Sequence, residues 1–89
     1  MPSLSAIIMA FNEAESLPAV VEEVGAVLSA SHGGYEIIIA DDGSQDGTGR
    51  IADELSRSRP NVRVIHHATN RGLGEVYRSG FASARGELI

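Results

Sequence analysis

Cysteine and lysine are both absent from the sequence. Without cysteine the chain can form no disulfide, no thiol nucleophile and no cysteine-ligated zinc site. Without lysine it can hold neither the P-loop lysine nor a Schiff base, and it lacks the late lysine of phosphoacceptor receiver domains. These classes of site are therefore excluded before any motif is considered.

Long hydrophobic runs are missing as well. The longest, Ala6–Ala10 and Ile37–Ala40, are far too short to cross a bilayer. The chain does not open on a basic segment followed by a long apolar stretch, so no signal peptide is evident. We therefore expect a cytoplasmic protein with no membrane segment in this chain, although the full-length protein could be membrane-associated.

Basic residues are few and unevenly placed. The 89 residues carry a net charge of −5, which disfavours a nucleic-acid partner. Residues 1–49 contain eight acidic residues and no arginine, whereas all seven arginines lie in residues 50–89. The hydrophobic content of 43% is typical of one folded, globular domain rather than of a disordered chain.

Short apolar segments alternate with segments of helical periodicity. Strands are expected where β-branched and apolar residues cluster, at Leu4–Met9, Tyr35–Ala40, Val62–Ile65 and Glu87–Ile89. Helices are expected where apolar residues recur at helical spacing, around Leu17–Leu28, Ile51–Leu55 and Leu73–Ala84. The order β-α-β-α-β-α-β predicts an α/β fold, a mostly parallel sheet with helices on both faces.

Chemically suggestive residues follow the first three expected strands. They are Phe11-Asn12-Glu13, Asp41-Asp42 and Arg71-Gly72. Ligands of open parallel sheets bind beyond the C-terminal strand ends, so we expect these three segments to meet at one edge.

The acidic loop after the second expected strand, Asp41–Thr48, admits three interpretations. An ionised carboxylate only accepts hydrogen bonds, so Asp42 could read the imide N–H of uracil or the N–H groups of guanine. Alternatively, the loop is an exposed acidic turn in which Asp46 or Thr48 caps the next helix. A calcium loop is a third, weaker interpretation, with ligands at Asp42, Ser44, Asp46, Thr48 and Asp53.

The other two segments are weaker signals. Phe11 could stack on a base or ribose, or could close the edge of the core, and Glu13 could simply favour the following helix N-terminus. Arg71 and Gly72 precede an expected helix, whose N-terminus favours anions, but a tight turn with a solvated arginine fits equally. His66 and His67 are expected at a frayed strand end, where neighbours face opposite ways, and no catalytic histidine is predicted.

Taken together, these segments resemble the nucleotide-binding half of family 2 glycosyltransferases, which have the Rossmann-like GT-A fold. The resemblance rests on three stretches in order, Ile7–Glu13, Glu36–Thr48 and Asn70–Gly74, and is continued by Tyr77–Phe81 and Ala84–Glu87. The subgroup that it most resembles is the polyprenyl- or dolichyl-phosphate sugar synthases. Two positions depart from the family: Met9 replaces a frequent proline, and Phe11 replaces a frequent tyrosine.

The resemblance implies a role for each matching residue. Ala10, Phe11 and Glu13 would line the nucleoside pocket, and Asp42 would contact the base. The turn that carries Arg71 and Gly72 would close over the nucleotide.

The resemblance also implies a reaction, the transfer of a sugar from a UDP- or GDP-sugar to an acceptor such as a polyprenyl phosphate, with inversion. Mg²⁺ or Mn²⁺ would be held by an aspartate-x-aspartate motif, expected only after Ile89, and not tightly by this chain. We therefore expect residues 1–89 to be the N-terminal part of an incomplete glycosyltransferase domain, inactive alone, with an open sheet edge that could pair with a second copy. The alternative is a non-catalytic nucleotide-binding or assembly module.

Overall fold

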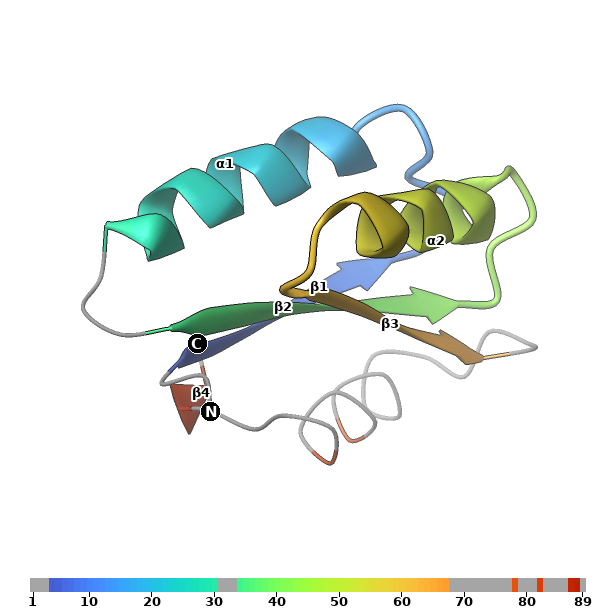
Figure 1. Cartoon of the computed structure of the whole chain (residues 1–89). Coiled ribbons are helices and arrows are strands. Elements are labelled where there is room, and N and C mark those ends of the chain that lie inside the picture. The colour runs from blue at the N-terminus through green and yellow to red at the C-terminus, as the bar shows by residue number, and fades with distance from the viewer. Residues whose placement is uncertain (1–3, 31–33, 68–77, 79–81, 83–86, 89) are drawn as a thin grey trace.

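The computed structural model describes residues 4–30, 34–67, 78, 82, 87 and 88. Strands and helices alternate along them (Figure 1), as β1 (Leu4–Ala10), α1 (Leu17–Ser29), β2 (Tyr35–Asp42), α2 (Thr48–Ser58), β3 (Val62–His67) and β4 (Glu87–Leu88). Apart from the helix expected between β3 and β4, which lies almost wholly outside the described residues, the order of these elements is the one that the sequence predicts.

The strands form one parallel sheet in the order β3-β2-β1-β4. β1 and β2 pair from Leu4 opposite Tyr35 to Ala10 opposite Asp41. On the other side of β2, the pairing with β3 ends with His67 opposite Asp42. The predicted parallel α/β fold is therefore confirmed, and β1, β2 and β3 end at the same edge of the sheet.

Both described helices cover one face of this sheet (Figure 1). The third helix expected over Leu73–Ala84 lies outside the described residues, apart from Arg78 and Ala82, which are helical. The expected helical cover of the second face therefore falls on residues that the structure does not describe. Neither α1 nor α2 is long and apolar enough to cross a membrane.

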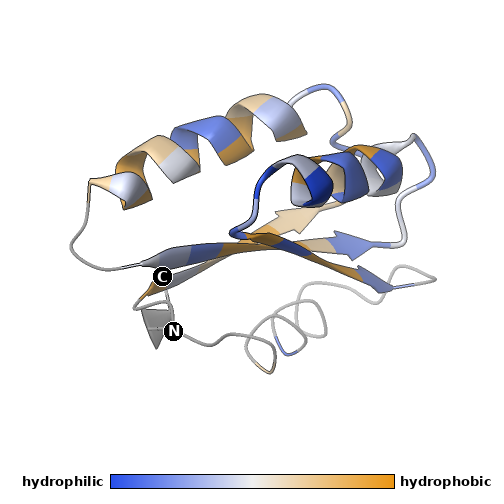
Figure 2. Cartoon of the chain, viewed as in Figure 1, coloured by the Kyte–Doolittle hydropathy of each residue, from blue (hydrophilic) through white to orange (hydrophobic). Residues whose placement is uncertain are grey.

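Alternate strand residues build the core beneath the helices. Ile37 and Ile39 of β2 pack in one cluster with Val21 of α1 and Ala52 of α2, and all four are almost fully buried. Burial of each large apolar side chain contributes about 1.5–3 kcal/mol. Figure 2 shows the hydrophobic colour along much of the strands and on parts of α1, and the hydrophilic colour over much of α2.

The starts of the two helices differ from the expected caps. Ser16 occupies the N-cap position of α1, but its hydroxyl donates to the Glu13 carboxylate over 2.9 Å instead of capping the helix. The N-cap position of α2 is Gly47, at φ +97°, which glycine adopts without steric cost. Asp46, one residue before this N-cap position, nevertheless accepts a hydrogen bond of 3.0 Å from the Thr48 N–H. The expected aspartate therefore does bond the start of α2, although it is not the N-cap residue.

On the face of the sheet away from the helices, the side chains of Ser5, Glu36 and Arg63 form a polar ladder across three strands. Glu36 of β2 is buried, accepts a hydrogen bond of 2.6 Å from the Ser5 hydroxyl of β1, and pairs with Arg63 of β3 at 2.8 Å. These contacts join three strands through one carboxylate. Because a buried charge without a partner is costly, the ladder constrains the register of the sheet.

We expect Glu36→Gln to lower the free energy of unfolding by about 1–3 kcal/mol. Breaking a fully buried pair costs about 3–5 kcal/mol, but the Arg63 side chain is 32% exposed, so water would partly solvate it. Urea unfolding monitored by circular dichroism measures the change. Glu22→Gln, on the exposed side of α1, is the control and should stay within about 0.5 kcal/mol of the unaltered chain. Equal stability of the two variants would contradict the ladder's role.

Candidate functional site

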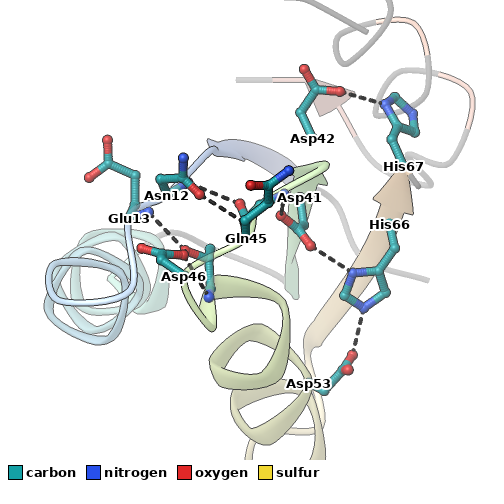
Figure 3. Close-up of polar contacts among 11 residues, drawn as sticks. Asn12, Glu13, Asp41, Asp42, Gln45, Asp46, Asp53, His66 and His67 are labelled. Atoms are coloured by element: carbon teal, nitrogen blue, oxygen red, sulfur yellow. Dashed lines mark hydrogen bonds and ion pairs between the residues drawn. The ribbon is translucent and has the colours of Figure 1, made fainter. Parts of the chain in front are cut away.

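The segments that follow β1 and β2 are held together by hydrogen bonds (Figure 3). The Asn12 backbone N–H donates to the Ser44 hydroxyl over 2.9 Å, and the Gln45 N–H donates to the Asn12 side-chain oxygen over 2.9 Å. Asn12 has φ +53°, a left-handed conformation that asparagine tolerates better than most residues. The turn after β1 is therefore fixed against the loop after β2.

A second set of bonds ties the same turn to the start of α2. The Glu13 N–H donates to the Thr48 hydroxyl over 2.8 Å, and the Ala14 N–H donates to Asp46 over 3.2 Å. Thr48 is fully buried, and its hydroxyl also bonds Asp46. The hydrogen bonds that Asp46 itself accepts, first from the Thr48 hydroxyl and then from the Thr48 and Ala14 N–H groups, hold the pKa of its carboxyl below the usual value.

A shallow cavity of about 470 Å³ opens beside these contacts. Its lining is polar and comprises Asn12, Glu13, Ala14, Glu15, Ser16 and Asp46. Phe11, next to this lining in sequence, is 47% exposed, which is unusual for a large aromatic side chain. The edge thus combines a fixed polar surface with an aromatic ring accessible to a ligand.

The acidic pair does not belong to an exposed turn, which was one of the three interpretations of this loop; only the later part of the loop, at Gln45 and Asp46, is exposed. Asp41 and Asp42 are the last two residues of β2 and are 6% and 5% exposed. The strand continues past the expected end because Asp41 pairs with Ala10 on one side and with His66 on the other. The two carboxylates point to opposite faces of the sheet, as successive strand residues must.

Each of these aspartates meets a histidine of β3 (Figure 3). His67 Nδ1 lies 2.9 Å from Asp42 Oδ1, and both side chains are 7% exposed. On the helical face, His66 Nδ1 lies 3.0 Å from Asp41 Oδ2, and His66 Nε2 lies 2.8 Å from Asp53 Oδ1 of α2. The expectation of a frayed strand end at the histidines is therefore wrong, because cross-strand pairing holds both rings.

The sequence does contain a pattern from which the two Asp–His pairs could be predicted. Two aspartates follow the apolar run of β2, and two histidines follow that of β3. Because parallel strands in register bring their ends to the same level, two adjacent Asp–His pairs could have been expected.

The calcium interpretation does not fit these contacts. The carboxylates expected to bind calcium have separate partners. Asp42 contacts His67 on one face of the sheet, Asp53 contacts His66 on the other, and Asp46 accepts a hydrogen bond at the start of α2. No group of three or more histidine, aspartate or glutamate side chains suited to a metal ion occurs in the part of the chain that the structure describes.

Four of the six predicted site residues lie among the described residues. Ala10 is buried at the end of β1, with the exposed Phe11 and Glu13 after it, and Asp42 ends the adjacent strand. The expected meeting of the first two segments at one edge is therefore observed. Arg71 and Gly72 lie outside the described residues, so their place relative to this edge stays a prediction.

Gly49 of α2 leaves room for the Asp41–His66 contact. A Cβ atom at this position would lie 2.8 Å from Asp41 Oδ2 and 3.4 Å from the His66 ring. We expect Gly49→Ala to lower the free energy of unfolding by about 1 kcal/mol, because overpacking costs about 1–3 kcal/mol and the gain in helix propensity returns about 1.

Gly25→Ala on α1 is the matched control, measured in the same urea titrations. Its added Cβ would meet the Tyr35 hydroxyl at an ordinary 3.7 Å, so stability should rise. If both alanine variants are stabilised equally, the close approach of Gly49 to Asp41 is not a constraint.

Comparison with known sequences finds one matching family and several relatives. The family model described as glycosyl transferase family 2 matches residues 5–89. The polyprenol monophosphomannose synthase of Mycolicibacterium smegmatis is 43% identical over 76 residues, which cover 84% of this chain and 27% of that protein. A dolichyl-phosphate beta-glucosyltransferase of Drosophila melanogaster is 40% identical over 93 residues, covering 97% of this chain and 28% of that protein. The chain thus spans little more than a quarter of the length of these relatives.

Solved structures agree on the fold. A Pyrobaculum calidifontis mannosyltransferase in complex with GDP-Man and Mn²⁺ matches 98% of this chain with a TM-score of 0.76 at 21% identity, over 26% of its own length. TarS of S. aureus gives the same TM-score at 23% identity, with the same coverage. At these identities the likeness establishes the fold alone, and it is the GT-A fold implied by the sequence. On the evidence of the family match over residues 5–89, this chain belongs to glycosyl transferase family 2.

Proposed function

We propose that residues 1–89 form the donor-nucleotide-binding part of an inverting glycosyltransferase domain that takes its sugar from a UDP- or GDP-sugar. The observation that carries this proposal is the junction of the turn after β1 with the loop after β2. It fixes Asn12 and Glu13 against Ser44 and Thr48 and leaves Phe11 exposed beside them. Such an edge, beyond the C-terminal ends of parallel strands, is where ligands of these sheets bind.

The relatives support the classes of donor and acceptor. One is named a polyprenol monophosphomannose synthase and another a dolichyl-phosphate glucosyltransferase, so a polyprenyl phosphate is the acceptor that we propose. A structural neighbour was solved with GDP-Man and Mn²⁺, which supports a nucleotide-sugar donor. Because the chain spans little more than a quarter of these proteins, we assign acceptor binding and transfer to the larger enzyme and expect the isolated chain to be inactive.

Each site residue receives a role from its position. The ring of Phe11 would stack on the base or ribose, and the small side chain of Ala10 would let the nucleoside approach the end of β1. The Asp42 carboxylate, held by His67 at 2.9 Å, would accept a hydrogen bond from the base. Glu13 would bound the ribose side of the pocket, and Arg71 with Gly72 would contact the diphosphate.

We propose Mg²⁺ or Mn²⁺ for the complete enzyme only. A divalent ion on the diphosphate would offset the charge that develops on the leaving group. The described residues gather no set of ligands for it, so we give none of them a role at the metal. Self-association is likewise proposed only through an edge of the sheet, where β3 and β4 are the two outer strands of the described order.

Nucleotide titration by isothermal calorimetry tests the assignment of Asp42. We expect the chain to bind UDP or GDP weakly, with little dependence on Mn²⁺, and Asp42→Asn to lower the affinity about tenfold, the lower limit for a hydrogen bond to a charged group. Glu23→Gln on the exposed side of α1 removes the same charge at a distance and serves as the control. Unchanged affinity in Asp42→Asn would remove Asp42 from base recognition, and no binding of either nucleotide would favour an assembly module.

Phe11 provides a second, independent test. Since a base stacked on an aromatic ring gains about 1–3 kcal/mol, Phe11→Ala should weaken nucleotide binding about 5- to 150-fold, whereas Phe11→Tyr should retain it. The side chain is 47% exposed, so the substitution should change the urea midpoint little. Loss of stability together with unaltered affinity would instead place Phe11 in the core.

A further inference from the structure

His66 contacts two carboxylates from two different elements. Its Nδ1 lies 3.0 Å from Asp41 Oδ2 at the end of β2, and its Nε2 lies 2.8 Å from Asp53 Oδ1 on α2. An ionised carboxylate only accepts hydrogen bonds, and a neutral imidazole has a single N–H to donate. Both contacts can be hydrogen bonds only if the ring is doubly protonated, so this geometry is that of an imidazolium.

The contacts continue from His66 to the turn after β1. The second oxygen of Asp41 accepts the Ser44 N–H over 3.2 Å, and the Ser44 hydroxyl accepts the Asn12 N–H over 2.9 Å. Asn12 adjoins Phe11, the exposed aromatic of the candidate site. An unbroken series of hydrogen bonds therefore links α2, β3 and β2 to that turn.

The charges around His66 favour its protonated form. Asp41 faces it from β2 and Asp53 from α2, and the hydrogen bonds with Asp53 and then Asp41 raise the pKa of His66 above its usual 6.5. Arg50 and Arg57 stand three residues before and four residues after Asp53 on α2, and both are exposed. The ring is 43% exposed, so water and hydroxide can reach it.

We propose that His66 is a positioning residue for the nucleotide site, and that its doubly protonated ring holds Asp41, and through it the Ser44–Asn12 contact, in the geometry that binds the nucleoside. This inference rests on the proposed function. Loss of the proton removes one of the two hydrogen bonds of the ring and leaves its bare nitrogen facing a carboxylate. Asp41 then loses its fixed position, and the turn after β1 loosens.

The direction of the pH dependence follows from the raised pKa. The ring carries its proton in mildly acidic solution and loses it as the pH rises through the raised pKa, which lies above the usual 6.5. The stabilisation from the two contacts is therefore complete in mildly acidic solution and is lost as the solution becomes alkaline. Nucleotide affinity should follow the same course.

The first experiment needs no nucleotide. Nitrogen-15 NMR of the 89-residue chain, titrated between about pH 5.5 and 9, follows the two ring nitrogens of His66. We expect both to be protonated at low pH, a midpoint above 6.5, and the backbone amide signals of Ser44 and Asn12 to shift with the same midpoint. Asp53→Asn should lower that midpoint, whereas Glu54→Gln, the next acid on α2 and exposed, should not.

The second experiment measures binding of UDP and GDP across the same pH range. Affinity of the unaltered chain should fall at least about fivefold through the His66 titration, the lower end of coupling between linked sites. His66→Gln should bind at the weaker level throughout, with no step at that pH. Comparison of the two chains at each pH cancels the titration of the nucleotide itself.

Each result decides the proposal. It is overturned if the Ser44 and Asn12 amides do not follow the His66 titration, or if a nucleotide binds equally tightly on both sides of it. If neither nucleotide binds at any pH, the proposed function fails, while the amide signals still decide whether His66 positions the turn. If His66→Gln does not fold, Asp53→Asn supplies the test, since its affinity step should move to lower pH.

Discussion

The parallel register of β1, β2 and β3 is the constraint on which the site depends. It places Ala10 opposite Asp41 and Asp41 opposite His66, so the last residues of three strands lie level at one edge. A shift by one residue would turn every side chain of a strand to the other face. Asp41 would then leave the helical face, and the contacts that join it to His66 and Ser44 would be lost.

Burial of two adjacent carboxylates at this edge requires compensation, and β3 supplies it on both faces. On the helical face His66 lies between Asp41 and Asp53 of α2, and on the opposite face His67 adjoins Asp42. The buried side chains at the strand ends are therefore polar and hydrogen-bonded to one another, whereas those in the middle of the strands are apolar. The residues that stabilise the sheet edge also fix the turn after β1 and the loop after β2, which form the proposed nucleotide site.

The fold could be predicted from the sequence to a large extent. The apolar runs of β1 and β2 and the helical spacing of Leu17, Val21 and Leu28 are local patterns, and local patterns decide the type of an element. The burial of Asp41 and Asp42 could not be predicted in the same way. Their surroundings predicted a loop, whereas strands distant in sequence made them part of the sheet.

For the candidate site, too, some features follow from the sequence and others only from the tertiary structure. By itself, the sequence determined the order of elements and the edge at which polar residues gather, because strand direction and connection follow from the alternation of short apolar runs with helices. The family came instead from a resemblance carried by three motifs, Ile7–Glu13, Glu36–Thr48 and Asn70–Gly74. Only the tertiary structure decided that Asn12 bonds Ser44 and that His66 joins Asp41 to Asp53. These pairs are separated by 13 to 32 positions, and a hydrogen bond requires a distance and direction that only the packed chain provides.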